Sequence, residues 1–318
     1  MIFLGPVFAF WQFTGRNNLT RKKSKQAIPL LKLPQLVLLD CIENLDVLEI
    51  IILSLLSKRA KSIAKLIRWN HLDIRLKFGE CAQICLRFST NPGVEWIIDY
   101  IKKTEYPYFR SIPVGPKVYR HLVPKDNGNS IEDIKKMIEH ICEVFRSPIC
   151  EIDIFDESLI EWLINFQPTI RYVSIENNLV LSIRKLDRIF NSLKVTEHFQ
   201  WRSIATSLRN SKSTDCENFH ITEPIPFSSI SISNSYWLTL PSILDATNSV
   251  ICLYDSKLTS NDINTILKQW QQGIKLRNLE FLQIETSITE DLDSFAIEVV
   301  KDLDWTESGG NDGRPMTM

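Results

Sequence analysis

The first regular pattern along the chain is a group of three short helical segments within residues 28–68. Residues Gln35 to Leu45 predict one helix, because their apolar residues recur near helical spacing. Asp46 followed by Glu49 resembles a capping box and predicts the start of a second helix. Ser57 then precedes a basic amphipathic segment, which predicts a third. Residues 28–68 therefore form a small helical module.

This module contains more apolar residues than a unit of its size can bury, because small domains bury a small fraction of their surface. Leu36 lies in one stripe with Leu39 and Ile42, and the second helix carries the continuous apolar run Ile50 to Leu53. Either the run is a surface for a partner, or the rest of the chain covers it. Composition leaves both interpretations open.

Residues 69–146 begin with a clear strand pattern. Leu72–Phe78 and Ala82–Phe88 alternate apolar and polar residues and predict a hairpin or the start of a sheet. A helix with a regular apolar stripe follows from Ser130. Between them, prolines and glycines predict an irregular connection; they are Pro107, Pro113, Gly115, Pro116, Pro124 and Gly128.

Residues 147–305 repeat a short β-rich run, with starts that are 22, 26, 31, 22 and 29 residues apart. The predicted strands are Ile149–Ile154, Arg171–Ile175, Glu197–Trp201, Ser228–Ile232, Val250–Leu253 and Leu279–Ile284. The helical stretches between them are Leu159–Phe166, Ile183–Leu193, Leu240–Ala246 and Asp262–Gln272, the last stopped by Gly273. This period is typical of leucine-rich-repeat solenoids. The alternative is an ordinary α/β sheet, since the spacing is irregular and the asparagine-ladder consensus is missing.

Composition is that of a soluble protein, with 318 residues, 44% hydrophobic, 24% charged and a formal net charge of −1. This balance gives no overall bias toward nucleic acid or membranes. Bases are concentrated in residues 16–32 and acids in residues 285–307. The seven cysteines contain no Cys-x-x-Cys pair, which indicates reduced thiols in the cytoplasm or the nucleus.

The two ends give weaker signals. Met1 to Phe13 is apolar, but it lacks a basic n-region and is shorter than the ~20 residues that span a bilayer. We expect residues 1–27 to be a disordered or uncertain extension. Residues 306–318 contain a Gly-rich run, which predicts a flexible tail.

Signatures of known catalytic sites are missing from the sequence. We find no phosphate-binding loop, dinucleotide fingerprint, nucleophile elbow or zinc-protease motif. Cys81 and Cys85 have His71 near, but the run between them is a predicted strand, so they would not converge on zinc and core packing is favoured. The basic run Arg21 to Lys25 is a weak signal for nucleic acid. We expect a protein that is not an enzyme, with no catalytic residues, metal or cofactor, and with neither a membrane nor nucleic acid as partner.

A resemblance to a known family rests first on residues 28–68. Ile-Pro-Leu-Leu-Lys-Leu-Pro at 28–34 leads into the leucine-rich helix, and Ser-Leu-Leu-Ser-Lys-Arg follows at 54–59. Together these segments resemble the F-box of the large nematode family of F-box proteins. Near the other end, Leu258–Asn264, Leu267–Trp270 and Arg277–Leu282 resemble the type-2 F-box-associated region of the same family.

The resemblance implies a fold, a function and a set of contacts. Together with the residue patterns above, it gives an α+β or α/β fold, with a three-helix F-box-like module at 28–68, connecting strands, a Pro-rich linker and a helix at 69–146, and a leucine-rich-repeat-like α/β domain of strand-helix units at 147–305. The F-box would dock onto the Skp-type adaptor of a cullin-RING ubiquitin ligase, and the C-terminal domain would bind an unknown protein substrate. The alternatives are an interaction scaffold without ligase assembly and an enzyme of unrecognised type.

Nine residues of the module are the expected adaptor contacts. At least half of them should instead be internal core of the module. Leu33 and Pro34 are the best candidates, because an extended Leu-Pro pair ahead of a helix cannot bury itself within that helix. The full set is Leu33, Pro34, Leu38, Ile42, Leu45, Ile50, Leu53, Ser57 and Lys58.

Overall fold

A computed structural model describes residues 33–101, 107–125, 130–176, 183–202, 225–286 and 292–303. The extension predicted at 1–27 and the tail predicted at 306–318 lie outside these residues. The chain divides into two compact units, Met1–Ile149 and Cys150–Met318. The sequence placed a domain boundary at 146/147. The first unit holds both the helical module and the segment that was expected only to connect it.

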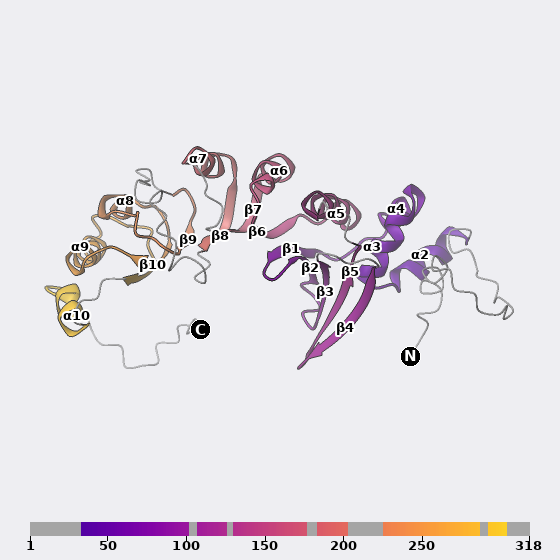
Figure 1. Ribbon diagram of the computed structural model, residues 1–318, viewed down its shortest axis with the longest axis horizontal. Coiled ribbons are helices and arrows are strands. Elements are labelled where there is room, and N and C mark those ends of the chain that lie inside the picture. The colour runs from indigo at the N-terminus through magenta and orange to yellow at the C-terminus, as the bar shows by residue number, and fades with distance from the viewer. Residues whose placement is uncertain are drawn as a thin grey trace. The chain divides into compact units, whose positions relative to one another are not determined.

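Three helices open the first unit: α2 (Gln35–Glu43), α3 (Val47–Leu56) and α4 (Lys58–Ala64). Helix α3 packs against α4, and α2 also contacts α4 (Figure 1). The three helices predicted for this part of the chain are confirmed.

The first unit then contributes five sheet strands, with the spatial order β1-β2-β3-β5-β4. Its strands are β1 (Leu72–Phe78), β2 (Ala82–Phe88), β3 (Val94–Tyr100), β4 (Tyr108–Val114) and β5 (Lys117–Val123). The predicted hairpin is β1–β2, paired from Leu72 with Phe88 to Phe78 with Ala82. Strands β3 and β5 pair in parallel, and the remaining neighbours are antiparallel.

Alternation along β1 buries one face of this sheet, since Leu72, Ile74 and Leu76 are fully buried. Helix α5 (Ser130–Phe145) contacts both β1 and α3. Its predicted apolar stripe is buried over most of its length. The amide of Leu72 donates to the hydroxyl of Ser147 at 3.0 Å, which ties the end of α5 to the start of β1.

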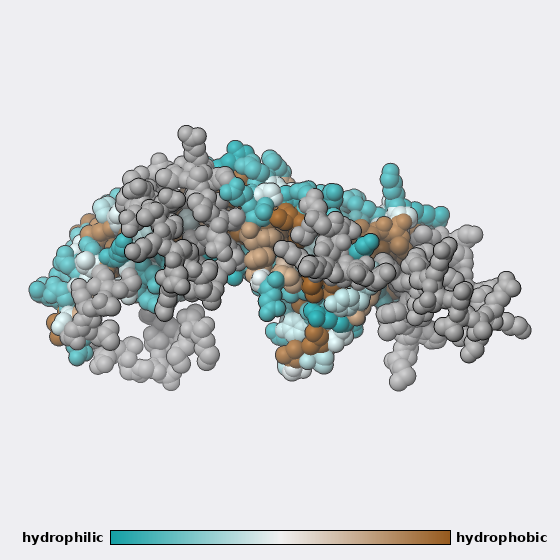
Figure 2. Space-filling model, in the orientation of Figure 1, coloured by the Kyte–Doolittle hydropathy of each residue, from teal (hydrophilic) through white to brown (hydrophobic). Residues whose placement is uncertain are grey.

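The predicted irregular connection is wrong, because Pro113 and Pro116 lie within a β-hairpin, which Pro107 and Pro124 flank. Gly115 and Pro116 form the two-residue turn between β4 and β5, and Gly115 adopts a φ of +58°, which suits glycine. Pro113 lies in β4, at the edge of the sheet, where a missing N–H disrupts no ladder. Figure 2 shows hydrophobic side chains on the surface of this hairpin, where Tyr108, Phe109, Ile112 and Val114 are exposed.

The second unit alternates strands and helices. Its strands are β6 (Ile149–Ile154), β7 (Thr169–Glu176), β8 (Lys194–Arg202), β9 (Ser229–Ile232), β10 (Val250–Ser256) and β11 (Phe281–Thr286). Its helices are α6 (Ser158–Phe166), α7 (Ile183–Ser192), α8 (Leu240–Leu244), α9 (Ser260–Gln271) and α10 (Leu292–Val300). Each predicted strand and helix of this region overlaps one of these elements.

Strands β6 to β11 lie side by side in chain order, and every neighbouring pair is parallel. Helices α6 to α9 lie along one side of the strands (Figure 1). The register aligns apolar residues of successive strands into buried rows such as Ile152, Val173, Phe199, Ile230 and Ile251. The strand-helix units predicted from the sequence are therefore present, and the whole chain has an α+β fold.

Candidate functional site

Helix α2 begins directly after Pro34, whose carbonyl oxygen accepts from the amide of Leu38 at 2.9 Å. Leu38 and Ile42 form its buried side. The opposite side is apolar too: Leu36 is 82% exposed and Val37 is 47% exposed. The helix therefore carries apolar residues on both sides, and only one side packs within the first unit.

Helix α3 begins at the predicted capping box. The amide of Glu49 donates to the carboxylate of Asp46, and the amide of Asp46 donates back to the carboxylate of Glu49, each at 3.0 Å. The apolar run from Ile50 to Leu53 is at most 7% exposed. The interpretation of this run as a surface for a partner is wrong, because the chain itself covers it. Leu55 and Leu56, which end the helix, are about half exposed.

Helix α4 begins at Ser57, whose side-chain oxygen accepts from the amide of Ala60 at 3.1 Å. This cap satisfies one of the unpaired amides of the first turn. Ala60 and Ala64 are fully buried, whereas Lys58 is exposed. The small alanines let α4 lie close to its neighbours, while Lys58 and Arg59 are exposed.

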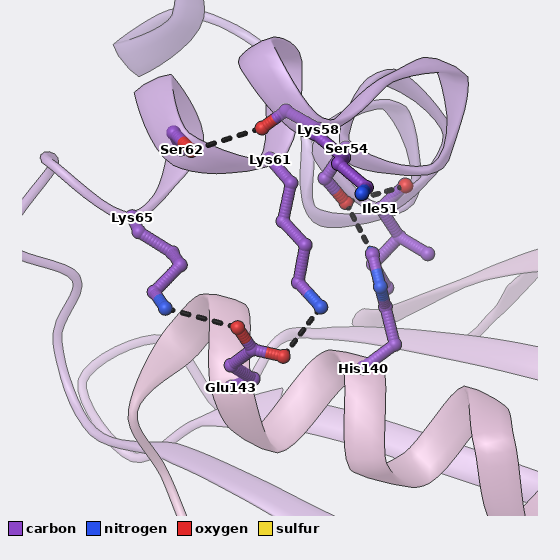
Figure 3. A network of polar contacts seen from close by, with 8 residues as sticks. All are labelled: Ile51, Ser54, Lys58, Lys61, Ser62, Lys65, His140 and Glu143. Atoms are coloured by element: carbon purple, nitrogen blue, oxygen red, sulfur yellow. Dashed lines mark hydrogen bonds and ion pairs between the residues drawn. The ribbon is translucent and has the colours of Figure 1, made fainter.

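Helix α5 is joined to α3 by a hydrogen bond between Ser54 and His140 (Figure 3). The Ser54 hydroxyl donates to the Ile51 carbonyl at 2.7 Å. His140 must therefore donate its Nε2 proton to the Ser54 oxygen, 2.6 Å away, which assigns the tautomer. Burial lowers the pKa of His140 below its ordinary value of 6.5, and the ammonium of Lys61 acts in the same direction. The imidazole is thus neutral when it bridges the two helices near pH 7.

A second contact joins α5 to α4. Lys61 and Lys65 both donate to the carboxylate of Glu143, the latter at 3.0 Å (Figure 3). These hydrogen bonds lower the pKa of Glu143 to about 2. The carboxylate is largely exposed, so we assign the contact a role in orientation more than in stability.

Arg120 of β5 donates to the carboxylate of Asp46 at 2.6 Å, and so contacts the residue that caps α3. Together with the contacts to α5, it fixes the start of α3, the middle of α3 and the body of α4 to the rest of the first unit. The helical module is thus held by residues that lie far from it in the sequence.

The nine expected adaptor contacts separate into three groups by burial. Leu38, Ile42, Ile50 and Leu53 are buried in the first unit. Leu33 and Leu45 are half-buried, and the remaining three, Pro34, Ser57 and Lys58, are exposed.

Sequence reasoning missed the most exposed apolar residues of the module. It placed Leu36 in the same stripe as the buried Ile42 and did not single out Val37 or Leu66, which is 56% exposed. The signal for Leu36 and Val37 was present, because α2 has apolar residues all round and a surface helix needs only one apolar face.

The residues considered for zinc serve other roles. Cys85 is buried in β2, and burial raises the pKa of its thiol to about 12, so it stays protonated. His71 lies 3.9 Å from the carboxylate of Asp73. Within the described ranges, no three His, Cys, Asp or Glu side chains are grouped to hold a metal ion.

No helix in the described part of the chain is both long and apolar enough to cross a membrane.

Comparison with family models gives two matches. Residues 30–71, which contain α2, α3 and α4, match the F-box domain. Residues 216–284, which contain the segment from β9 to α9, match the F-box associated family. No curated protein and no solved structure matches the chain. Both matches overlap the segments that carried the sequence resemblance, so the chain contains one segment that matches the F-box domain and one that matches the F-box associated family.

Proposed function

We propose that this protein is the substrate-recognition subunit of a Skp-cullin-F-box ubiquitin ligase. Its F-box would dock onto the Skp-type adaptor, and through it onto the cullin-RING ligase. Its second unit would bind the target protein. In this arrangement the chain brings two proteins together and performs no catalysis itself.

The observation that carries the proposal is the set of exposed apolar side chains within the F-box match. Leu36, Val37, Leu55 and Leu56 are between 47% and 82% exposed. Leu36 and Val37 lie on α2, directly after the half-buried Leu33 and the exposed Pro34, whereas Leu55 and Leu56 lie at the end of α3. Exposed apolar residues gathered in one small module are typical of a surface that a partner covers.

The expected affinity contribution follows from burial. Covering one leucine side chain fully is worth about 1.5–3 kcal/mol. Removing one well-covered leucine would therefore weaken adaptor binding roughly tenfold to a hundredfold. Because Leu36 is 82% exposed in the chain alone, its removal should leave the fold intact.

The test is a pull-down of a purified Skp-type adaptor by the full chain, followed by titration calorimetry. Leu36→Ala/Val37→Ala and Leu33→Ala/Pro34→Ala are the test variants. Ile274→Ala is the matched control, because Ile274 is 55% exposed and lies in the second unit. We expect both test variants to lose affinity and the control to keep it. Equal binding by all variants would show that these residues do not form the docking surface.

The second candidate is an interaction scaffold that does not assemble a ligase, and the same experiment separates the two. A folded wild-type chain that fails to bind the adaptor would favour the scaffold. We also propose that the protein works in the cytoplasm or the nucleus. In support, none of the six cysteines in the described ranges forms a disulfide.

A further inference from the structure

The sheet of the second unit has a second face, opposite the rows that pack toward the helices. Register places side chains of all six strands there in line across the sheet. One row holds Glu151, Tyr172, His198, Ser229, Val250 and Phe281. The next holds Asp153, Ser174, Gln200, Ser231, Cys252 and Gln283. We call this surface the open face.

The polar side chains of the open face are held in place by one another. Arg202 donates to Ser174 at 2.6 Å and also to the buried carboxylate of Asp153. His198 and Ser229 are hydrogen-bonded at 2.7 Å. Side chains that are fixed before a partner arrives lose less conformational entropy on binding.

An aromatic and acidic patch lies at the β6–β8 end of the first row. Tyr172 is 40% exposed and pairs in register with Glu151 of β6. On its other side, the Tyr172 hydroxyl donates to the carboxylate of Glu197, which raises the pKa of Tyr172. Arg171 reaches Glu197 only loosely, at 3.9 Å. A tyrosine ring between two carboxylates offers a cation both π-electron and ionic contacts.

Charge on the open face has an acidic excess. Register places the acids Glu151, Asp153 and Glu285 and the base Arg202 on this face, and the carboxylate of Glu197 reaches it through its hydrogen bond with the Tyr172 hydroxyl. Asp153 and Arg202 neutralise each other. The carboxylates of Glu151 and Glu197 flank Tyr172, which favours a basic partner at that position over an acidic peptide or a nucleic acid.

We propose that the open face binds a basic, extended segment of the target protein, with a Lys or Arg side chain on Tyr172 between Glu151 and Glu197. The assignment rests on the proposed function, because it names the surface and the chemistry of target binding. The exposed Phe281 is the apolar anchor at the far end of the row, four strand spacings or about 19 Å from Tyr172. An extended chain spans that distance in about six residues. The recognised segment therefore carries its base and an apolar residue about six positions apart.

The test uses fluorescein-labelled Gly/Ser peptides and the full chain, with binding followed by fluorescence anisotropy. One peptide carries Lys and Leu about six residues apart; a second has Glu in place of Lys; a third has Lys and Leu adjacent. We expect the first to bind at least about tenfold more tightly than the second, because one ion pair changes sign. The third should bind more weakly than the first.

Protein variants locate the site. Glu197→Gln and Tyr172→Ala should each weaken binding of the first peptide several-fold, and Tyr172→Phe should keep the part due to the ring. Glu161→Gln is the matched control, since Glu161 is an exposed carboxylate on α6, on the helix side. The proposal would be overturned if the Glu peptide bound more tightly than the Lys peptide, or if no peptide bound at all. It would also be overturned if Glu161→Gln weakened binding of the first peptide as much as the test variants do. Adaptor pull-down with the same variants should be unchanged, so a failure of adaptor docking is distinguishable from a failure of the open face.

Discussion

Asp99 is the residue whose removal should destabilise the first unit most clearly. It lies in β3, is fully buried, and accepts hydrogen bonds from side chains of three other strands. Gln83 of β2 donates at 2.8 Å, Arg110 of β4 at 3.0 Å, and the Nδ1 atom of His121 of β5 lies at 2.7 Å. One carboxylate thus links four of the five strands of this sheet.

The variant Asp99→Ala removes the acceptor and leaves three donors behind, of which His121 is itself buried. Breaking a buried charged pair by deleting one partner costs about 3–5 kcal/mol. Small domains have total unfolding free energies of about 5–15 kcal/mol, so this loss is a large share. We therefore expect the first unit to become much less stable, even though no apolar contact is removed.

The assay is hydrogen exchange followed by mass spectrometry, with peptides from β2, β3 and β5 read separately from those of the second unit. Hydrogen-exchange protection of the β2, β3 and β5 peptides should fall by an amount equivalent to about 3 kcal/mol or more. The control is Glu161→Ala, whose ion pair with Arg188 is about half exposed and should contribute less than about 1 kcal/mol. The reasoning is wrong if Asp99→Ala reduces hydrogen-exchange protection no more than the control does, or reduces it only in the second unit.

Two further predictions concern the F-box helices. Burial lowers the pKa of His140 in the folded chain, so the unfolded chain binds the proton more readily. The free energy of unfolding should therefore be at its full value above pH 6.5 and should fall as the pH drops toward the lowered pKa of the folded chain. Thermal unfolding of wild type and His140→Gln between about pH 5 and about pH 7.5 checks this, and parallel curves for the two proteins would contradict it. Ser57→Ala removes the cap of α4 and should cost about 1 kcal/mol in urea unfolding, whereas Ser57→Asp should retain most of the stability.

Patterns within a single element were predictable from the sequence. The alternation in residues 72–88 gave both strands of the β1–β2 hairpin, and the capping box at Asp46 gave the start of α3. The recurring β-rich runs of the second unit gave all six of its strands. These signals are local, because backbone geometry fixes the period at which side chains return to one face.

Features that depend on pairing between distant segments were not predictable. The prolines of residues 107–124 indicated a loop, yet β4 tolerates Pro113 because it lies at the edge of its sheet. Strand β3 was not predicted at all. Nor did any motif place His121 beside Asp99, since parallel pairing of β3 with β5 brings them together.

The same distinction applies to the docking surface. The sequence by itself determined that residues 28–68 form three helices with an excess of apolar residues, and it located both F-box-related segments. Only the tertiary structure decided which apolar residues remain exposed. Ile50 to Leu53 is covered within the first unit, where α5 is bonded to α3, while Leu36 and Val37 stay at the surface. Burial is a property of what packs against a residue, and for α3 part of that packing comes from a helix whose contact residue lies 86 positions further along the chain.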